Sequence, residues 1–263
     1  MKNNRSFFDT FLPCLKCLLY FSAFYLTSVL VSSIIQAIAM ALGKSVPASL
    51  VGITAYIIVV IGLALGHIPF KTTLLKEAKI NKPRIRFVVD GALFGIGFFG
   101  AFQGIAFLIS KLPFSWIESM LRMQNDVASN QLDGNIAFAI LYLGIFAPIC
   151  EEIVFRGLML SSLKDYIPKW VGIIACALCF GVIHFSSPMA MIVTFILGIM
   201  LGWIFHSTSS LIPCILAHML FNVSNFLLFI PKNIGFYILV IACIPLITYS
   251  VIDIVRRGSH ENL

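Results

Sequence analysis

Two adjacent glutamates and an arginine lie inside a strongly apolar run of the sequence. The stretch ICEEIVFRG contains Glu151, Glu152 and Arg156, surrounded by residues suited to a lipid bilayer. An ionisable side chain at the centre of a membrane helix costs at least about 2.5–3.5 kcal/mol, so such residues usually face a protein interior or a cavity. Glu152 and Arg156 are four residues apart and therefore share a helix face, where they can pair. Glu151 points about 100° away, so we expect the two glutamates to have different tasks.

Two later apolar segments carry the other polar groups that could do chemistry. FGVIH places Phe180 one helical turn before His184, and AHMLFN places His218 one turn before Asn222. Counted along each helix at about 1.5 Å per residue, these groups and Glu151 lie at similar depths. We therefore predict one shared polar cavity near the middle of the membrane.

This set of side chains is suited to amide hydrolysis. Glu151 and His184 can hold a water molecule between them, with the carboxylate as general base. His218 and Asn222 can donate hydrogen bonds to the oxygen that becomes negative when a carbonyl group is attacked.

Two other interpretations of the same residues stay open. Glu151, His184 and His218 could instead bind zinc and leave one position for water. The chain has no H-E-x-x-H motif, and we favour the arrangement without a metal. The polar groups could also merely connect helices by hydrogen bonds, which is the weaker interpretation because six of them gather on three segments.

The composition indicates the elements that must position these side chains. Apolar residues make up 60% of the 263 residues, charged residues 11%, and the mean hydropathy is +1.00, which is typical of an integral membrane protein. We expect a single membrane domain over residues 1–263. Eight apolar segments are long enough to be membrane helices: residues 16–42, 47–69, 87–110, 135–163, 169–186, 188–206, 211–229 and 233–255.

The basic residues are distributed unevenly between the two ends of these segments. Fourteen Lys and Arg residues fall at the end that carries the N-terminus, against four at the other. By the positive-inside rule this places both termini in the cytoplasm. The short basic loops suit anionic lipid head groups, so the net charge of +7 is no sign of nucleic-acid binding. The first segment is interpreted as an uncleaved helix, with a cleaved signal peptide as the alternative.

Three further patterns have structural interpretations. The connection at residues 112–134 is typical of an amphipathic interfacial helix, either a connector, which we favour, or a lid. GIGFFG, residues 95–100, matches G-x-G-x-x-G but lies within a membrane segment, where such glycines favour close helix packing and not dinucleotide binding. The seven cysteines are interpreted as small apolar side chains and not as a disulfide framework.

The three polar stretches resemble the motifs of a known family. EEIVFRG, FGVIHF and HMLFN, in this order on successive apolar segments, are similar to the motifs E-E-x-x-x-R, F-x-x-x-H and H-x-x-x-N of the CPBP family. This family, also called Abi, includes CAAX prenyl endopeptidases and bacteriocin-processing enzymes. The resemblance covers about residues 136–223, and the first half of the chain matches only in its hydrophobicity.

The resemblance implies an all-α, polytopic membrane bundle of about eight transmembrane helices with an internal polar cavity. It implies an intramembrane endopeptidase that acts on a peptide or protein at the membrane, in the cytoplasmic membrane of a bacterium. The resemblance implies that Glu151 is the catalytic glutamate and that His184 is its partner on the water. It implies that His218 and Asn222 are the oxyanion donors. The residues that would support the site or contact substrate are Glu152, Arg156 and Phe180. Family members have been described as metalloproteases, so a divalent metal such as zinc stays an alternative. A non-catalytic bacteriocin-immunity or scaffold protein on the same fold is the rival function.

Overall fold

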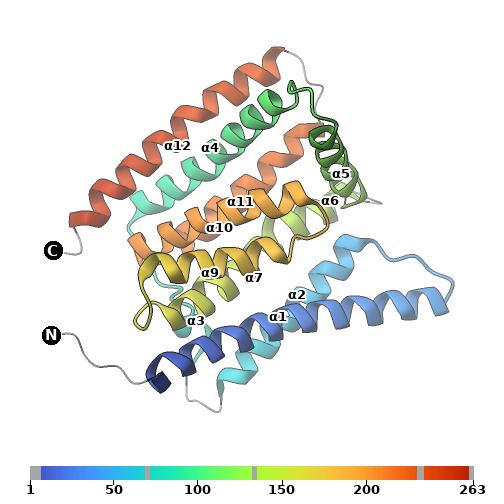
Figure 1. Ribbon diagram of the computed structural model, residues 1–263. Helices are drawn as coiled ribbons and strands as arrows, with labels where there is room; N and C mark the ends of the chain where they lie inside the picture. The colour runs from blue at the N-terminus through green and yellow to red at the C-terminus, as the bar shows by residue number, and fades with distance from the viewer. Residues whose placement is uncertain (1–6, 69–71, 132–134, 230–233, 261–263) are drawn as a thin grey trace.

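The protein is a bundle of helices (Figure 1). The computed structural model describes residues 7–68, 72–131, 135–229 and 234–260, and these ranges contain helices and turns but no strand. The elements in chain order are α1 (Phe7–Ala41), α2 (Ala48–His67), α3 (Leu74–Glu77), α4 (Ile85–Ile109), α5 (Ser115–Gln131), α6 (Ile136–Ala139), η2 (Ile140–Phe146), α7 (Ala147–Glu152), η3 (Ile153–Leu160), α8 (Ser161–Leu163), α9 (Lys169–Val182), α10 (Pro188–Thr208), α11 (Ile212–Asn225), η4 (Phe226–Phe229) and α12 (Ile234–His260).

The predicted all-α membrane bundle is confirmed. Within the described residues, six helices are long and apolar enough to cross a bilayer, one of them the continuous stretch Ile136–Leu163 made of α6 to α8. The fifth and seventh expected segments correspond to the shorter apolar helices α9 and α11, which have 14 residues each. The fifth segment was predicted to reach residue 186, but the helix ends at Val182, four residues before the predicted end.

The segment that carries the two glutamates is not a regular α-helix. It widens into π-helical turns at η2 and again at η3, with the short α-helix α7 between them. Pro148 lies at the start of α7, where its ring clashes with the carbonyl group four residues earlier and its nitrogen cannot donate a hydrogen bond. A wider turn before the proline accommodates both effects, and π-turns are frequent at functional sites.

Glycines allow α4 to lie directly against α11; the sequence predicted close packing at these glycines but not the partner helix. A Cβ atom at Gly95 would lie 2.2 Å from the backbone oxygen of Ala217, and one at Gly91 would lie 2.5 Å from that of Pro213. Residues with a side chain at these positions would push the two helices apart. The close packing matters for the site because Ala217 directly precedes His218.

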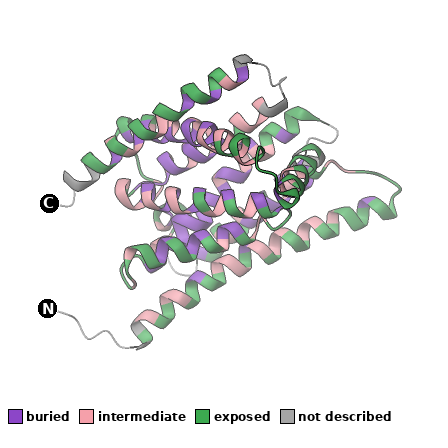
Figure 2. Cartoon of the chain, turned by 45° about the horizontal axis from the view of Figure 1, so that its top comes forward, coloured by how far each residue is buried: buried purple, intermediate pink, exposed green. Residues whose placement is uncertain are grey.

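The buried core lies around the motif-bearing helices (Figure 2). Residues 150–160 of α7 and η3 are all buried, whereas α1 and α12 expose long apolar faces of the kind a bilayer would cover. α1 and α2 pack against each other as a hairpin, and α1 also contacts η3. The second half of α1 runs beyond the rest of the bundle in Figure 1.

Interhelical contacts connect the loops at the basic end of the bundle. Arg86 at the start of α4 forms an ion pair with Asp253 near the end of α12, with Nε and Oδ2 2.9 Å apart. Lys16 of α1 pairs with Glu77 of α3. The Oγ atom of Ser210, before α11, donates to the carbonyl oxygen of Asn81 at 3.0 Å. The N-terminal parts of α1, α4 and α11 and the C-terminal part of α12 therefore lie at one end of the bundle.

All seven cysteines are free thiols, in agreement with the absence of a predicted disulfide framework. The two C-x-x-C pairs, although distant in sequence, approach each other in the core. Cys17 on α1 and Cys176 on α9 are both buried in the same hydrophobic core.

Candidate active site

Polar residues from each of the three motifs line one cavity of about 740 Å³. Glu151, His184, His218 and Asn222 all line it. The remaining walls come from α1, α2, α5, the first turns of α10 and the ends of α4 and α11. The structure thus brings the predicted residues of three separate segments to one place.

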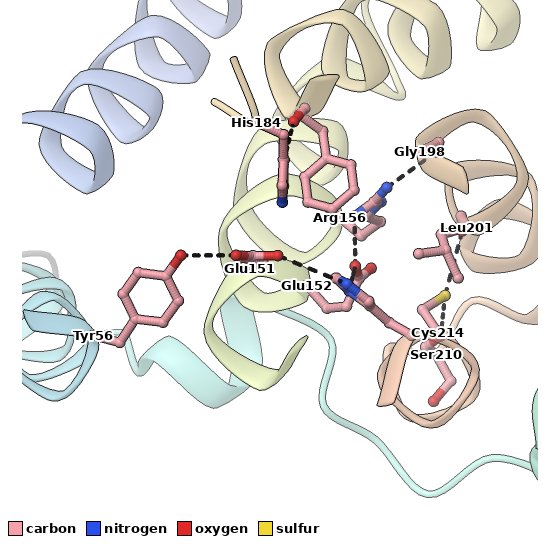
Figure 3. Close-up of polar contacts among 11 residues, drawn as sticks. Tyr56, Glu151, Glu152, Arg156, His184, Gly198, Leu201, Ser210 and Cys214 are labelled. Carbon is pink, nitrogen blue, oxygen red and sulfur yellow. Dashed lines mark hydrogen bonds and ion pairs between the residues drawn. The ribbon is translucent and has the colours of Figure 1, made fainter. Parts of the chain in front are cut away.

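Glu151 lies at the buried floor of this cavity. Its side chain is 4% exposed, and its Oε1 atom accepts a hydrogen bond of 2.8 Å from the hydroxyl group of Tyr56 on α2. Its Oε2 atom lies 3.8 Å from Nε2 of His218. Figure 3 shows Tyr56 approaching the carboxylate from one side, while Glu152 and Arg156 lie on the other. Glu151 therefore has a neutral hydroxyl donor as its direct partner and a face open to the cavity.

Glu152 points away from the cavity and forms the predicted pair with Arg156. The Nη1 atom of Arg156 lies 2.5 Å from Oε1 of Glu152, and Nη2 donates to the carbonyl oxygen of Gly198 on α10 at 3.1 Å. The guanidinium group also lies over the ring of Phe180, 4.6 Å from its centre. Both charged side chains are buried, so the pair joins η3 to α9 and α10 inside the bundle.

His218 bridges the two glutamates. Its Nδ1 atom lies 3.0 Å from Oε1 of Glu152, while Nε2 faces Glu151. Because a carboxylate can only accept, Nδ1 carries a proton in this contact. Nε2 of the neutral ring then holds a lone pair, and only the doubly protonated ring can donate from both nitrogens.

His184 lies in the turn that follows α9, and not within the helix as the sequence predicted. Its Nδ1 atom contacts the carbonyl oxygen of Phe180 at 2.8 Å. A carbonyl group only accepts, so Nδ1 is the protonated nitrogen and Nε2 is left free. The ring packs edge-on against Phe180 at 5.0 Å, and His218 packs against the same aromatic ring at 5.6 Å. Phe180 thus holds both imidazoles and Arg156 in position.

Asn222 is held by a contact that the sequence did not indicate. Its Nδ2 atom donates to the carbonyl oxygen of Leu143, in the π-helical turn η2, at 2.8 Å. A carboxamide nitrogen has two hydrogens, so one N–H remains for a group in the cavity. The bond fixes the orientation of the side chain, because it determines which end of the carboxamide is the nitrogen.

The three candidate zinc ligands are not grouped as a ready-made metal site. Among the described residues, no three His, Cys, Asp or Glu side chains are placed so that they could hold a metal ion together. Of the two ring nitrogens of His218, Nδ1 contacts Glu152, so only Nε2, which faces Glu151, could bind a metal ion.

Two contributors to the site were missed in the sequence. Tyr56 is a lone tyrosine in an apolar segment, and its only signal was a hydroxyl group within a membrane helix. Gln124 of α5 lines the cavity together with Asn125, so the amphipathic helix is part of the wall and more than a connector.

Comparison with known families agrees with the motifs. Residues 133–224 match the family model described as Type II CAAX prenyl endopeptidase Rce1-like. No curated protein sequence and no solved structure matches the chain. The match covers the helices from α6 to α11 that carry Glu151, His184 and His218. It supports the role of a CAAX-type intramembrane protease with a peptide or protein substrate, and the six candidate spans suggest an integral membrane protein. Over residues 133–224 of its 263 residues, the chain is thus similar to the Rce1-like, CPBP family of CAAX prenyl endopeptidases.

Proposed function

We propose that the protein is an intramembrane endopeptidase in which Glu151 activates the attacking water molecule. The observation that carries this proposal is the position of Glu151. It is a buried carboxylate at the floor of a cavity that two imidazoles also line, and its hydrogen-bond donor is the neutral hydroxyl group of Tyr56.

The hydrolysis needs only groups that line the cavity. A water molecule held by Glu151 and the free Nε2 atom of His184 loses a proton to Glu151 as its oxygen attacks the carbonyl carbon of the peptide bond. The carbonyl oxygen becomes an oxyanion. When the carbon–nitrogen bond breaks, the proton passes from Glu151 to the leaving nitrogen. The products are a carboxylic acid and an amine, and Glu151 is ionised again.

The oxyanion requires donors placed before the reaction begins. The second N–H of Asn222 can act in every protonation state of the site. His218 can take part only when its ring is doubly protonated, since Nδ1–H is already directed at Glu152. We therefore assign Asn222 the permanent donor role and His218 a conditional one, with Glu152, Arg156 and Phe180 as supporting residues.

The proposal includes the membrane arrangement. The chain is one domain over residues 1–263 in the cytoplasmic membrane of a bacterium, with both termini in the cytoplasm. The charge asymmetry of the loops supports this orientation.

Peptide cleavage by the purified full chain tests the proposal. In detergent, wild-type protein is mixed with a library of quenched-fluorescent peptides, and Glu151→Gln should lower kcat by about 10²–10⁴-fold, the usual contribution of a general base. Glu118→Gln is the matched control, because Glu118 is an exposed glutamate on α5 that pairs with Arg122. Cleavage that survives Glu151→Gln would exclude the proposed base.

Two further outcomes separate the alternatives. A chelator should leave the rate unchanged, and loss of activity that zinc restores would instead indicate a metal enzyme. A folded wild-type protein that cleaves no peptide in the library would favour the immunity or scaffold function.

A further inference from the structure

We infer that the catalytic cavity opens on the non-cytoplasmic face of the membrane and binds an uncharged, extended peptide segment of about five residues. This inference rests on the proposed function and adds to it the side from which the substrate enters and the chemistry that selects it.

The position of the cavity along the bundle is the first observation. Its lining comes from the second half of α1, the first half of α2, the last part of α4, the connection α5, the turn after α9 and the last part of α11. All these segments meet at the same end of an up-and-down bundle. None of the lining residues belongs to the loops between α2 and α4, between α8 and α9, or between α10 and α11.

Those three loops mark the opposite, basic end. Arg156, one of the fourteen basic residues assigned to this end, is buried in its pair with Glu152 and does not lie in a loop. Without it, thirteen Lys and Arg residues belong to the basic end and four to the cavity end. By the positive-inside rule the basic end is cytoplasmic, so the cavity end faces away from the cytoplasm.

Exposure shows where the cavity has its mouth. Glu151 and His218 at the floor are buried, whereas Gln36 of α1 and Asn125 and Ser129 of α5 are exposed. The lining therefore changes from buried to exposed in the direction away from the basic end. A substrate would enter between α1 and α5.

The walls carry uncharged hydrogen-bonding groups. Ser28, Ser32 and Gln36 lie four residues apart along α1, so they form one polar stripe that faces the cavity. Gln124 of α5 also lines the cavity, and its Oε1 atom is buried without a hydrogen-bond partner in the protein. A buried acceptor of this kind is costly unless a ligand supplies a donor, and a peptide N–H group is such a donor.

The same lining disfavours charged side chains. Apart from Glu151 and the two histidines, the described residues that line the cavity include no Asp, Glu, Lys, Arg or His that could pair with a substrate charge. Burial of an unpaired charge is strongly unfavourable. The occupant that fits is thus a stretch of polar backbone with small or neutral side chains.

The length follows from helix geometry. The lining runs along α1 from Phe24 to Gln36, which lie twelve positions apart, or about 18 Å at 1.5 Å per residue. An extended chain advances about 3.3 Å per residue, so about five residues fit between the mouth and the floor.

Membrane vesicles of opposite orientation test the side of entry. A water-soluble, uncharged peptide that the detergent-purified enzyme cleaves is added to right-side-out and to inverted vesicles from cells that express the full chain. Cleavage by right-side-out vesicles alone is expected. Cleavage by inverted vesicles alone, by both kinds equally, or only after detergent would overturn the inference while leaving the proposed function intact. If no peptide is cleaved even in detergent, the proposed function fails and this inference fails with it.

A matched pair of glutamine variants tests the binding chemistry. Gln124→Leu should raise KM about tenfold and leave kcat unchanged, because it removes a hydrogen bond to bound peptide. Gln103→Leu is the control. Its Nε2 atom is also buried without a partner, but it does not line the cavity, so its KM should equal that of the wild type. An unchanged KM for Gln124→Leu would refute recognition by this wall.

The selection against charge has its own measurement. A Lys or Asp placed two residues from the cleaved bond should lower kcat/KM at least about tenfold relative to Ser. Equal rates for the charged and the neutral peptides would contradict the assigned substrate class.

Discussion

Replacement of Arg156 by methionine should reveal how strongly the buried ion pair supports the site. The substitution keeps a long side chain but removes the ion pair with Glu152, the bond to the carbonyl oxygen of Gly198 and the contact with the ring of Phe180. Glu152 would keep only His218 as a partner, and its Oε2 atom already has none. A buried carboxylate would thus lose its main neutralising group.

The expected loss of stability is large. Removal of one partner from a buried ion pair costs about 3–5 kcal/mol, and the lost hydrogen bond to Gly198 adds about 0.5–1.5 kcal/mol. Against a total stability of about 5–15 kcal/mol, the single variant should unfold at a clearly lower temperature. The double variant Glu152→Gln/Arg156→Met removes both charges and should recover at least half of the loss, because a neutral pair leaves no unpaired buried charge.

Unfolding in detergent, followed by tryptophan fluorescence, measures both variants. Arg156→Lys is a third point, since it keeps the charge but loses the planar fork that contacts two elements at once; its stability should fall between those of the wild type and Arg156→Met. Equal losses for Arg156→Met and the double variant would refute the argument, because the cost would then come from packing and not from the unpaired carboxylate.

Three further predictions follow from local contacts. Gly95→Ala should destabilise the fold by about 1–3 kcal/mol and lower kcat, because its Cβ would lie 2.2 Å from a backbone oxygen of α11. The control Gly104→Ala, on the same helix, meets no atom within 4 Å and should be neutral or slightly stabilising. Thermal unfolding compares the two variants, and equal effects would contradict the role of close packing. Tyr56→Phe should lower kcat/KM about 10–100-fold by removing the hydrogen bond to Glu151, and an unchanged rate would make that contact dispensable. Desolvation and a neighbouring lysine lower the pKa of Lys79 to about 8 from 10.5. The folded state is therefore destabilised below pH 8, and this destabilisation fades as the pH rises toward 10.5. Lys79→Gln should raise the melting temperature at pH 7 by an amount that shrinks above pH 8, and an increase independent of pH would exclude this cause.

Local spacing predicted the contacts that lie within one helix or one turn. The pairing of Glu152 with Arg156 follows from an interval of four residues, which survives even though η3 is π-helical. The edge-on contact of His184 with Phe180 also follows from this interval, although the histidine lies in a turn. In both cases the interacting side chains are so close in sequence that modest changes in backbone geometry do not separate them.

Contacts between distant segments were beyond the sequence. The bonds from Tyr56 to Glu151 and from Asn222 to Leu143 join residues 95 and 79 positions apart, and apolar helices offer no spacing that would predict them. The widened turns of η2 and η3 were also missed, although Pro148 within an apolar segment is a signal of a disturbed helix. The end of α9 at Val182 was overestimated because the residues up to 185 continue the apolar pattern.

The different environments of the two adjacent glutamates account for their different tasks. Glu152 is fully buried, receives an arginine and an imidazole on its Oε1 atom, and does not line the cavity. Glu151 receives a neutral hydroxyl group and faces the cavity. Transfer of a proton to Glu152 would leave the buried guanidinium group of Arg156 without its counter-ion, whereas transfer to Glu151 would not. Of the two glutamates, only Glu151 lines the cavity that water can enter. An exchange of roles would thus require both a new rotation of α7 and a new partner for Arg156, so the order of the two residues in the motif determines which of them can act as the base.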